Sequence, residues 1–521
     1  MKRRAFLATS TAALAAPAVA QPARVIRAVP QANLTSIDPV WTTANITRNH
    51  GHMVYDTLYG VDGDLTPQPQ MAEGHVIEED GRRVIITLRP GLAFHDGTPV
   101  LARDAAASIT RWMPRTAYGQ KLAEKLDEVA ALDDRRLVLR LKKPFPLLFN
   151  GLAQVSSACF VMPERIARTD PFKQIDDATG SGPFMFRKSE YNSGSLIVYD
   201  RNPRYLPRAG APSLIAGSKE AFFDRVEWQI IGDAATASAA LQRGEIDWYE
   251  QPPPELQDLM RRNANIAIEL IDPRPLCGLL RLNHLHPPFN DKKVRQAMLA
   301  AVVQSDYMSA IVGPDPSGFV ENVGVYTPGT PMANTAGMER LLAPRGVERA
   351  RAVLKESGYA GQLTRLIGPT DILAPAAMTQ VAADMFRQIG MNLDFALSDW
   401  GTVIQRRNSQ EPVEKGGWSA LCTSSASFDF VDPAVNSFIR GNGKAAWPGW
   451  PSVPELETLR DRWFDAPNLA MQQTIAAEIQ RVALDEVTYV PTGSYYARTA
   501  LRKNLKDRVT GIMILWGMKR A

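Results

Sequence analysis

The chain has 521 residues, of which 45% are hydrophobic and 22% charged, and its formal net charge is +4. Single hydrophobic cores stop growing at roughly 250 to 300 residues, so two or three domains are expected. The composition is that of an ordinary soluble globular protein and argues against a disordered or fibrous chain.

The first twenty residues have the pattern of a cleavable export signal. A basic start is followed by a short Ala-rich apolar run, and Ala18-Val19-Ala20 has the small-x-small form of a cleavage site. Arg3 to Leu7 also match the twin-arginine pattern R-R-x-F-L, although an ordinary secretory signal with two arginines is an alternative. We expect residues 1–20 to be a signal peptide of twin-arginine type, cleaved near Ala20, and the mature chain to be soluble and periplasmic.

Cleavage at this site changes the charge of the chain. Loss of Lys2, Arg3 and Arg4 removes three positive charges from the net charge of +4 and leaves +1. A nearly neutral protein gives no electrostatic reason to expect nucleic acid or an anionic membrane surface as a partner.

The segment from Val84 to Asp104 predicts a strand, two turns and a capped helix. Pro90-Gly91 and Asp96-Gly97 supply the turn residues, and Asp104 is placed to cap the helix that follows. His95 lies between the turns with no carboxylate or cysteine at metal-ligand spacing. We therefore expect a structural role for His95 rather than a catalytic or metal-binding one.

The segment from Leu279 to Val303 predicts a strand, a rigid corner and a helix in direct succession. Alternation of leucine with polar residues at its start indicates a half-buried strand, which Pro287-Pro288 must stop. Asn290 or Asp291 can then accept hydrogen bonds from the first turn of an amphipathic helix.

Three cysteines, Cys159, Cys277 and Cys422, form an odd set for an oxidising compartment. If the runs that hold Cys277 and Cys422 are neighbouring strands, a disulfide between them is a candidate. Three buried thiols are the alternative.

These segments, together with Gly180-Ser-Gly-Pro-Phe184 and Asp429-Phe-Val-Asp-Pro433, resemble a specific family. It is the bacterial extracellular solute-binding proteins of the dipeptide, oligopeptide and nickel type, family 5, which serve ABC importers. The run from Asn283 to Ala297, with its Pro-Phe, Asp and Val-Arg-Gln-Ala, is the most specific part of the match. The resemblance extends over essentially all of residues 24–521.

The resemblance implies an α/β fold of the cluster C type. This is a two-lobed periplasmic binding protein with an additional small domain and a ligand cleft between the lobes. The expected division gives residues 24–55, 181–270 and 490–521 to lobe I, residues 56–180 to the small domain, and residues 271–489 to lobe II.

In open α/β sheets, ligands bind beyond the carboxyl ends of strands. Two expected strand ends of lobe II, at Trp400 and at residues 424–432, should face residues 41–45 of the other lobe. The resemblance assigns Asp429 to the α-ammonium group of a bound peptide and Trp400 to an aromatic wall, a pairing that suits a partly desolvated cation. The predicted ligand-binding residues are Thr42, Thr43, Trp400, Trp418, Ser424, Ser425, Phe428 and Asp429.

One departure from the family pattern bears on the ligand. Peptide binders commonly have Trp three residues before the carboxylate, where this chain has Ala426 among small hydroxylated residues. Such residues suit hydrogen bonds to another polar solute or a tight turn. A purely structural role for Asp429, as the cap of the next helix, is the other alternative.

The predicted function is that of the periplasmic substrate-binding component of an ABC importer. Such a protein captures a small solute, here a peptide or peptide-like compound, and delivers it as a monomer to the membrane permease. No catalytic residue, metal or cofactor is predicted, since the sequence lacks G-x-S-x-G, H-E-x-x-H and C-x-x-C. His50-x-His52 and His284-x-His286 keep a nickel or metal-chelate carrier open, opines and oligosaccharides are other candidate solutes, and a secreted hydrolase is the last alternative.

Overall fold

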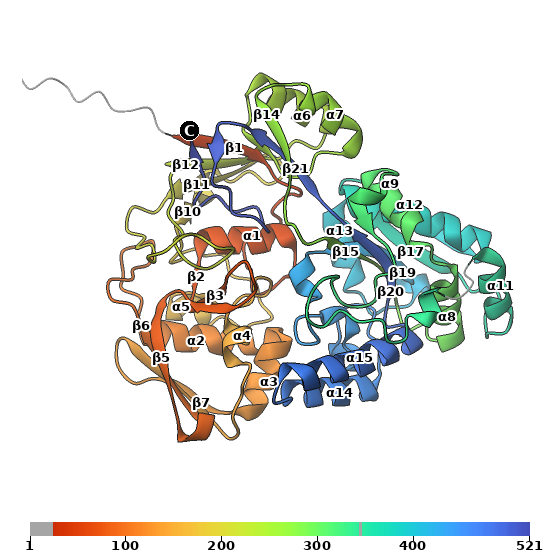
Figure 1. Cartoon of the computed structure of the whole chain (residues 1–521), viewed down its shortest axis with the longest axis horizontal. Coiled ribbons are helices and arrows are strands. Elements are labelled where there is room, and N and C mark those ends of the chain that lie inside the picture. The colour runs from red at the N-terminus through yellow and green to blue at the C-terminus, as the bar shows by residue number, and fades with distance from the viewer. Residues whose placement is uncertain (1–23, 343–345) are drawn as a thin grey trace, which may run out of the picture.

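The computed structural model describes residues 24–342 and 346–521, and Figure 1 shows their arrangement. The expected signal peptide, residues 1–20, lies outside the described residues. Three sheets of four or more strands organise the rest of the chain. None of the described helices has the length and apolar character needed to cross a membrane.

Lobe I is built on a seven-stranded sheet in the order β10-β11-β12-β1-β13-β21-β14. β1 pairs in parallel with β12 and β13, whereas the other pairings in the sheet are antiparallel. Its strands are β1 (Val25–Val29), β10 (Phe184–Phe186), β11 (Leu196–Arg201), β12 (Arg225–Gln229), β13 (Trp248–Tyr249), β14 (Ile266–Leu270) and β21 (Arg498–Arg502). The helices of this lobe are α1 (Asn45–Val54), α6 (Ala234–Arg243) and α7 (Pro254–Arg261).

The small domain contains a four-stranded antiparallel sheet in the order β5-β6-β8-β7. Its strands are β5 (Ala72–Glu78), β6 (Arg83–Leu88), β7 (Leu126–Ala131) and β8 (Arg136–Leu141), and its helices are α2 (Ala102–Trp112), α3 (Ala117–Lys125), α4 (Leu148–Leu152) and α5 (Glu164–Ala167). Short pairs join β2 (Asp56–Thr57) to β9 (Phe160–Val161) and β3 (Tyr59–Val61) to β4 (Pro67–Pro69). A last pair, β22 (Leu505–Lys506) with β23 (Lys519–Arg520), lies near the C-terminus.

Lobe II is built on a six-stranded sheet in the order β16-β20-β15-β19-β17-β18. Its strands are β15 (Leu276–Leu282), β16 (Phe319–Val320), β17 (Thr364–Pro369), β18 (Leu393–Ser398), β19 (Ala420–Ser425) and β20 (Val490–Tyr495). Its helices are α8 (Lys292–Ala301), α9 (Gln304–Val312), α10 (Glu339–Leu342), α11 (Val347–Lys355), α12 (Leu373–Gln388), α13 (Trp400–Arg407), α14 (Pro454–Phe464) and α15 (Leu469–Glu486).

The chain passes between the lobes twice, and the two passages run side by side. β14 pairs with β21 in lobe I up to Leu270 opposite Arg498, and β15 pairs with β20 in lobe II from Leu276 opposite Tyr495. Between these pairings the Ile271 N–H donates to the Ala497 carbonyl at 3.0 Å. The connection is therefore a two-stranded ribbon.

This pairing corrects one expected boundary. Residues 490–521 were assigned to lobe I, but Val490–Tyr495 forms β20 and pairs with β15 and β16 in the sheet of lobe II. An apolar run near the C-terminus does not reveal which sheet it joins, because both sheets accept a buried strand. The remaining boundaries stay a prediction.

The corner after β15 agrees with the prediction at the start of α8, but the burial of β15 itself differs from the prediction. Asp291 caps α8 by accepting from the N–H groups of Lys293 at 2.7 Å and Val294 at 3.4 Å, as predicted. β15 is not half-buried, however. Arg281, expected on a solvent-facing side, is fully buried because lobe II packs on both faces of this strand.

His95 has the structural role that the sequence indicates. Its Nδ1 accepts from the Gly180 N–H at 3.1 Å, and its Nε2 lies 3.1 Å from the Gly182 carbonyl, to which it donates. The ring thus fixes the loop that returns the chain to lobe I. Gly180 is required there, since a Cβ atom would lie 2.0 Å from the Val54 carbonyl oxygen.

Two buried ion pairs attach the small domain to lobe I. Arg111 of α2 contacts Asp38 at 2.7 Å with both side chains almost fully buried. Asp38 also accepts from backbone N–H groups of Val40 and Ile175, so it holds the turn after β1. Lys219 contacts Asp56 at 2.7 Å, again with both side chains buried. We infer that lobe I and the small domain move as one body.

Replacing one partner of such a pair leaves an uncompensated buried charge. We expect Arg111→Met to lower the free energy of unfolding by about 3–5 kcal/mol, measured by urea or thermal denaturation. Arg261→Met is the matched control, because its ion pair with Asp258 is exposed and should contribute less than about 1 kcal/mol. Equal losses in the two variants would show that the Asp38 pair does not hold the domains together.

Candidate ligand-binding cleft

A cavity with a volume of about 500 Å³ lies between the lobes. This is within the range of pockets that bind small molecules, roughly 300–1,000 Å³. All three parts of the structure line it. Lobe I contributes residues 31–32, 43–46 and 251, and the small domain residues 114–117, 120, 154–157 and 172. Lobe II contributes mainly residues 400, 404, 407, 423–425, 428–429, 434–435, 437–438, 440 and 444–448.

Two strand ends of lobe II open onto this cavity, as the fold class predicts. β19 ends at Ser425 and leads into a short 3-10 helix, Ser427–Asp429. β18 ends at Ser398, and Asp399 then caps α13 by accepting from the Thr402 N–H at 3.0 Å. Trp400, the first residue of α13, thereby lies at the cavity wall.

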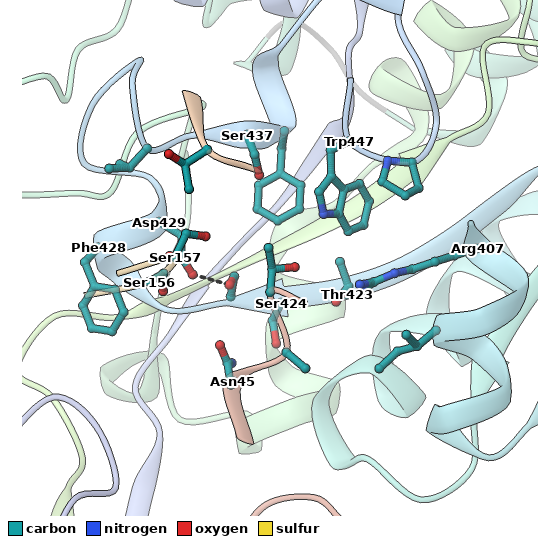
Figure 2. Close-up of a pocket in the computed structure, with 18 of the residues that line it drawn as sticks. Asn45, Ser156, Ser157, Arg407, Thr423, Ser424, Phe428, Asp429, Ser437 and Trp447 are labelled. Carbon is teal, nitrogen blue, oxygen red and sulfur yellow. Dashed lines mark hydrogen bonds between the residues drawn. The ribbon is translucent and has the colours of Figure 1, made fainter. Parts of the chain in front are cut away.

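Six of the predicted binding residues line the cavity: Thr43, Trp400, Ser424, Ser425, Phe428 and Asp429. Figure 2 shows Ser424, Phe428 and Asp429 with Ser156 and Ser157 of the small domain nearby. The Ser425 hydroxyl donates to the Asp429 carboxylate, and the Ser424 and Tyr495 hydroxyls are 3.0 Å apart. The hydroxyl-rich segment therefore holds the carboxylate in place.

Two other predicted residues are not among those that line the cavity. The Thr42 hydroxyl turns back to accept from the Ala44 N–H at 3.3 Å, at the entry to α1. Trp418 is fully buried, packs against Trp450 with ring centroids 5.8 Å apart, and donates to the Arg407 carbonyl at 2.9 Å. Trp418 precedes β19 and packs into a separate apolar cluster, so its predicted role as a ligand contact is wrong.

The candidate disulfide is also wrong, although the two cysteines do lie on adjacent strands. Cys159, Cys277 and Cys422 are all free and buried. In the β15–β19 pairing, Cys422 lies opposite Leu280 and Cys277 opposite Ser425. The two thiols are thus three positions out of register and on opposite faces of the sheet, roughly 10 Å apart along the strand. A disulfide cannot span that distance.

Three of the four histidines in the two sequence pairs have a hydrogen-bonding partner within the protein. His50 and His52 lie on α1, and each ring has its own partner. His50 Nδ1 is 2.9 Å from the Tyr199 hydroxyl, and His52 Nε2 is 2.8 Å from the Val155 carbonyl oxygen. His286 Nε2 lies 2.8 Å from the Gln410 carbonyl oxygen. Within residues 24–342 and 346–521, no group of three or more His, Cys, Asp or Glu side chains is placed to hold a metal ion.

A buried guanidinium of lobe I faces Asp429 across the lobe boundary. Arg48 of α1 donates to Asn45 Oδ1 at 3.1 Å and to Asn49 Oδ1 at 3.0 Å, and its guanidinium lies 5.1 Å from the Phe428 ring centroid. Burial lowers the pKa of Arg48, while the charge of Asp429 opposes that shift. Asp429 is therefore already partly balanced by a positive charge of the protein itself.

One side of the cavity is a wall formed by residues 437–448, and the sequence did not identify this segment as part of the lining. Arg281 of β15 fixes it by donating to the carbonyl groups of Phe438, Trp447 and Pro448, and also to that of Thr488, at 2.7–2.8 Å. Trp447 packs edge-on against Phe438 within this wall, with ring centroids 4.8 Å apart. The hydrogen bonds of Arg281 join segments more than 150 residues apart, which no local sequence pattern reports.

Arg407, the last residue of α13, is a second cavity residue that the sequence did not single out. It is 8% exposed and lies four residues after the buried Val403, on the same helix face. That i, i+4 relation is the signal that could have marked it as inward-facing.

Removing the Arg281 guanidinium should loosen this wall. We expect Arg281→Met to lower the free energy of unfolding by about 3 kcal/mol or more, because four carbonyl groups, two of them buried, lose their donor. Hydrogen exchange should also accelerate at the backbone amides of residues 438–448. Arg462→Met, which removes an exposed partner of Glu478, should change neither quantity appreciably. Unchanged exchange in residues 438–448 would contradict the assigned role.

Comparison with known proteins identifies the group of proteins that share these features. The family model for bacterial extracellular solute-binding proteins, family 5, middle region, matches residues 66–445. The chain is 36% identical over 499 residues to a "Probable peptide ABC transporter periplasmic-binding protein" of Sinorhizobium fredii, covering 94% of this chain and 92% of that protein. It is 26% identical over 470 residues to a glutathione-binding protein of Pectobacterium atrosepticum, covering 86% of this chain and 84% of that protein.

Solved structures share the fold at low sequence identity. The binding protein AgaA in complex with agropinic acid, from A. tumefaciens R10, matches with a TM-score of 0.79 at 18% identity, covering 95% of this chain and 99% of that chain. A dipeptide-binding protein of Pseudoalteromonas sp. SM9913 in complex with Met-Leu matches with a TM-score of 0.76 at 18% identity, covering 96% and 100%. The expected two-lobed α/β fold is thereby confirmed.

Proposed function

Because the chain belongs to the bacterial extracellular solute-binding proteins, family 5, we propose that it binds a peptide or peptide-like solute between its lobes and delivers it to an ABC importer. The observation that carries the proposal is the cavity of about 500 Å³ at the carboxyl ends of two lobe II strands, with both lobes in its lining. The two-stranded ribbon between the lobes suits a hinge that closes around a bound solute.

Relatives support a peptide-like solute. The Sinorhizobium protein is named for peptide transport, and the Pectobacterium protein for glutathione, itself a tripeptide derivative. Among the solved structures with this fold, one holds Met-Leu and another agropinic acid. The solute class proposed here therefore includes small amino-acid conjugates as well as short peptides.

We propose that binding leaves the solute chemically intact. The described residues that line the cavity include serine and threonine hydroxyls but no histidine or cysteine, so none of these hydroxyls has an imidazole base beside it within the cavity. The Ser425 hydroxyl donates to Asp429 and lies at the end of a strand, which suits positioning of the carboxylate.

The proposal extends to the location and the assembly of the protein. Its N-terminal pattern is that of a twin-arginine signal cleaved near Ala20, which would release a monomeric, soluble protein into the periplasm. The permease of the importer is its expected protein partner.

Thermal-shift screening against di- and tripeptides, opines and oligosaccharides tests the proposal. A solute that binds the folded state selectively must raise the midpoint of thermal unfolding. We expect a hit among the peptides or amino-acid conjugates, and mass spectrometry should recover it unchanged. A hit that returns cleaved would contradict the proposal, and so would the absence of any hit.

Asp429 is the proposed partner of a solute ammonium group. For a hit that carries a free amine, we expect Asp429→Asn to weaken binding by about 1.5–3 kcal/mol, the contribution of a charged hydrogen bond, as measured by calorimetry. Glu321→Gln, an exposed carboxylate change in the same lobe, is the control and should have no effect. Unchanged affinity of Asp429→Asn would assign the carboxylate to a structural role.

A further inference from the structure

The cleft contains a buried positive charge that no described side chain neutralises. Within the described residues, no protein acceptor binds the Arg407 guanidinium, and its Nε is buried without a hydrogen-bond partner. Burial alone lowers the pKa of Arg407 to about 10, with no carboxylate nearby to oppose the shift. Figure 2 shows the side chain reaching from α13 toward Thr423, close to Trp447.

A neighbouring arginine shows how this protein satisfies a guanidinium that has only a structural role. Both Arg281 and Arg407 lie against the Trp447 ring, with guanidinium carbons 5.3 and 5.0 Å from its centroid. Arg281 donates to four backbone carbonyl groups, whereas Arg407 donates to none within the described residues. A desolvated charge without a partner is costly, so Arg407 needs an acceptor that the described residues do not supply.

The other charges of the cavity have the same sign. The described lining contains four basic side chains, Arg115, Arg407, Arg440 and Lys444, against the single carboxylate of Asp429. That carboxylate is itself in the field of the buried Arg48. A solute that enters this cavity therefore meets an excess of positive charge in surroundings that screen it poorly.

The remaining basic groups are less available to a solute. Arg440 donates to Gln120 at 2.7 Å and lies 3.6 Å from Glu457. Arg115 donates to the carbonyl groups of Val40 at 3.3 Å and Trp41 at 2.6 Å. Lys444 is exposed at the rim. Arg440 leaves only its Nε without a partner, whereas Arg407 is the one arginine of this lining whose guanidinium donates to no described residue.

We propose that Arg407 binds an anionic oxygen group of the solute, a carboxylate or a phosphate ester, and that the preferred solute carries net negative charge. This inference rests on the proposed function and narrows it. The planar guanidinium can donate two parallel hydrogen bonds to either anion. The Trp447 face orients the guanidinium by a cation–π contact. Such a solute would place its anionic group at Arg407, and any amine would face Asp429.

Calorimetry with matched probes tests the charge preference. The probes are Glu-Glu, Ala-Ala and Lys-Lys, together with glutathione, glucose and glucose 6-phosphate. We expect the tightest binder to carry net negative charge, and a comparison of the peptides with the sugar phosphate separates a carboxylate from a phosphate preference.

Variants of Arg407 test the residue itself. Arg407→Gln should weaken the tightest anionic probe about 10- to 100-fold, since it removes a charged hydrogen-bond donor, and Arg407→Lys should retain part of the affinity. Lys355→Gln, at an exposed position of α11 outside the cavity lining, should change the affinity less than about threefold, because a distant exposed charge is screened. The unfolding midpoint of the solute-free protein should stay the same or rise in Arg407→Gln, because an unpaired buried charge is removed; a purely structural arginine would lower it.

The outcomes separate this inference from the proposed function. If the tightest probe is neutral or cationic, or if Arg407→Gln leaves the affinity of an anionic probe unchanged, the inference is overturned and solute binding stands. If no probe binds, both are overturned. If Arg407→Gln does not fold, Arg407 is structural and the inference fails.

Discussion

The ribbon that joins the lobes is the constraint on which the rest of the structure depends. All the strands of lobe I come before Leu270 or after Ala497, and all the strands of lobe II lie between these points. Both passages are antiparallel neighbours, paired at Leu270 with Arg498 and at Leu276 with Tyr495. Rotation about two adjacent strands can open and close the cavity without disturbing either sheet.

The rotation can capture a solute because the parts of the protein that line the cavity are rigid. The buried pairs Asp38–Arg111 and Asp56–Lys219 fix the small domain to lobe I, so residues 114–117 and 154–157 keep their position relative to α1. On the other side, Arg281 holds residues 438–448 by their carbonyl groups. A binding protein needs this preorganisation, because order that exists before binding costs no affinity when the solute arrives.

Local patterns in the sequence predicted the local structure. The Asp291 cap depends on residues two and three positions away, and the hydrogen bonds of His95 use a turn and a glycine loop of recognisable composition. The carboxyl ends of β18 and β19 could be located for the same reason. Six of the eight predicted binding residues line the cavity because they lie at or just after those strand ends or just before α1.

The predictions from sequence that proved wrong depend on strand register or on packing between distant segments. Whether Cys277 meets Cys422 depends on a pairing register that the strands' own sequences do not contain. Trp418 looks like any aromatic residue near a strand end until the position of Trp450 is known. The burial of Arg281 and Arg407 depends on residues 437–448, a loop without periodic pattern. The proposed charge preference of the solute, which rests on Arg407, was therefore out of reach of the sequence.

The central claim is that the lobes close on an intact solute while lobe I and the small domain move together. Spin labels at Arg262→Cys in lobe I, Lys355→Cys in lobe II and Asp127→Cys in the small domain report on it, since the three native thiols are buried. Pulsed electron paramagnetic resonance on labelled pairs measures the distances with and without a solute found by screening. The account predicts a changed distance between positions 262 and 355 and a constant distance between positions 262 and 127. A solute that binds without changing the first distance, or that also changes the second, would contradict it.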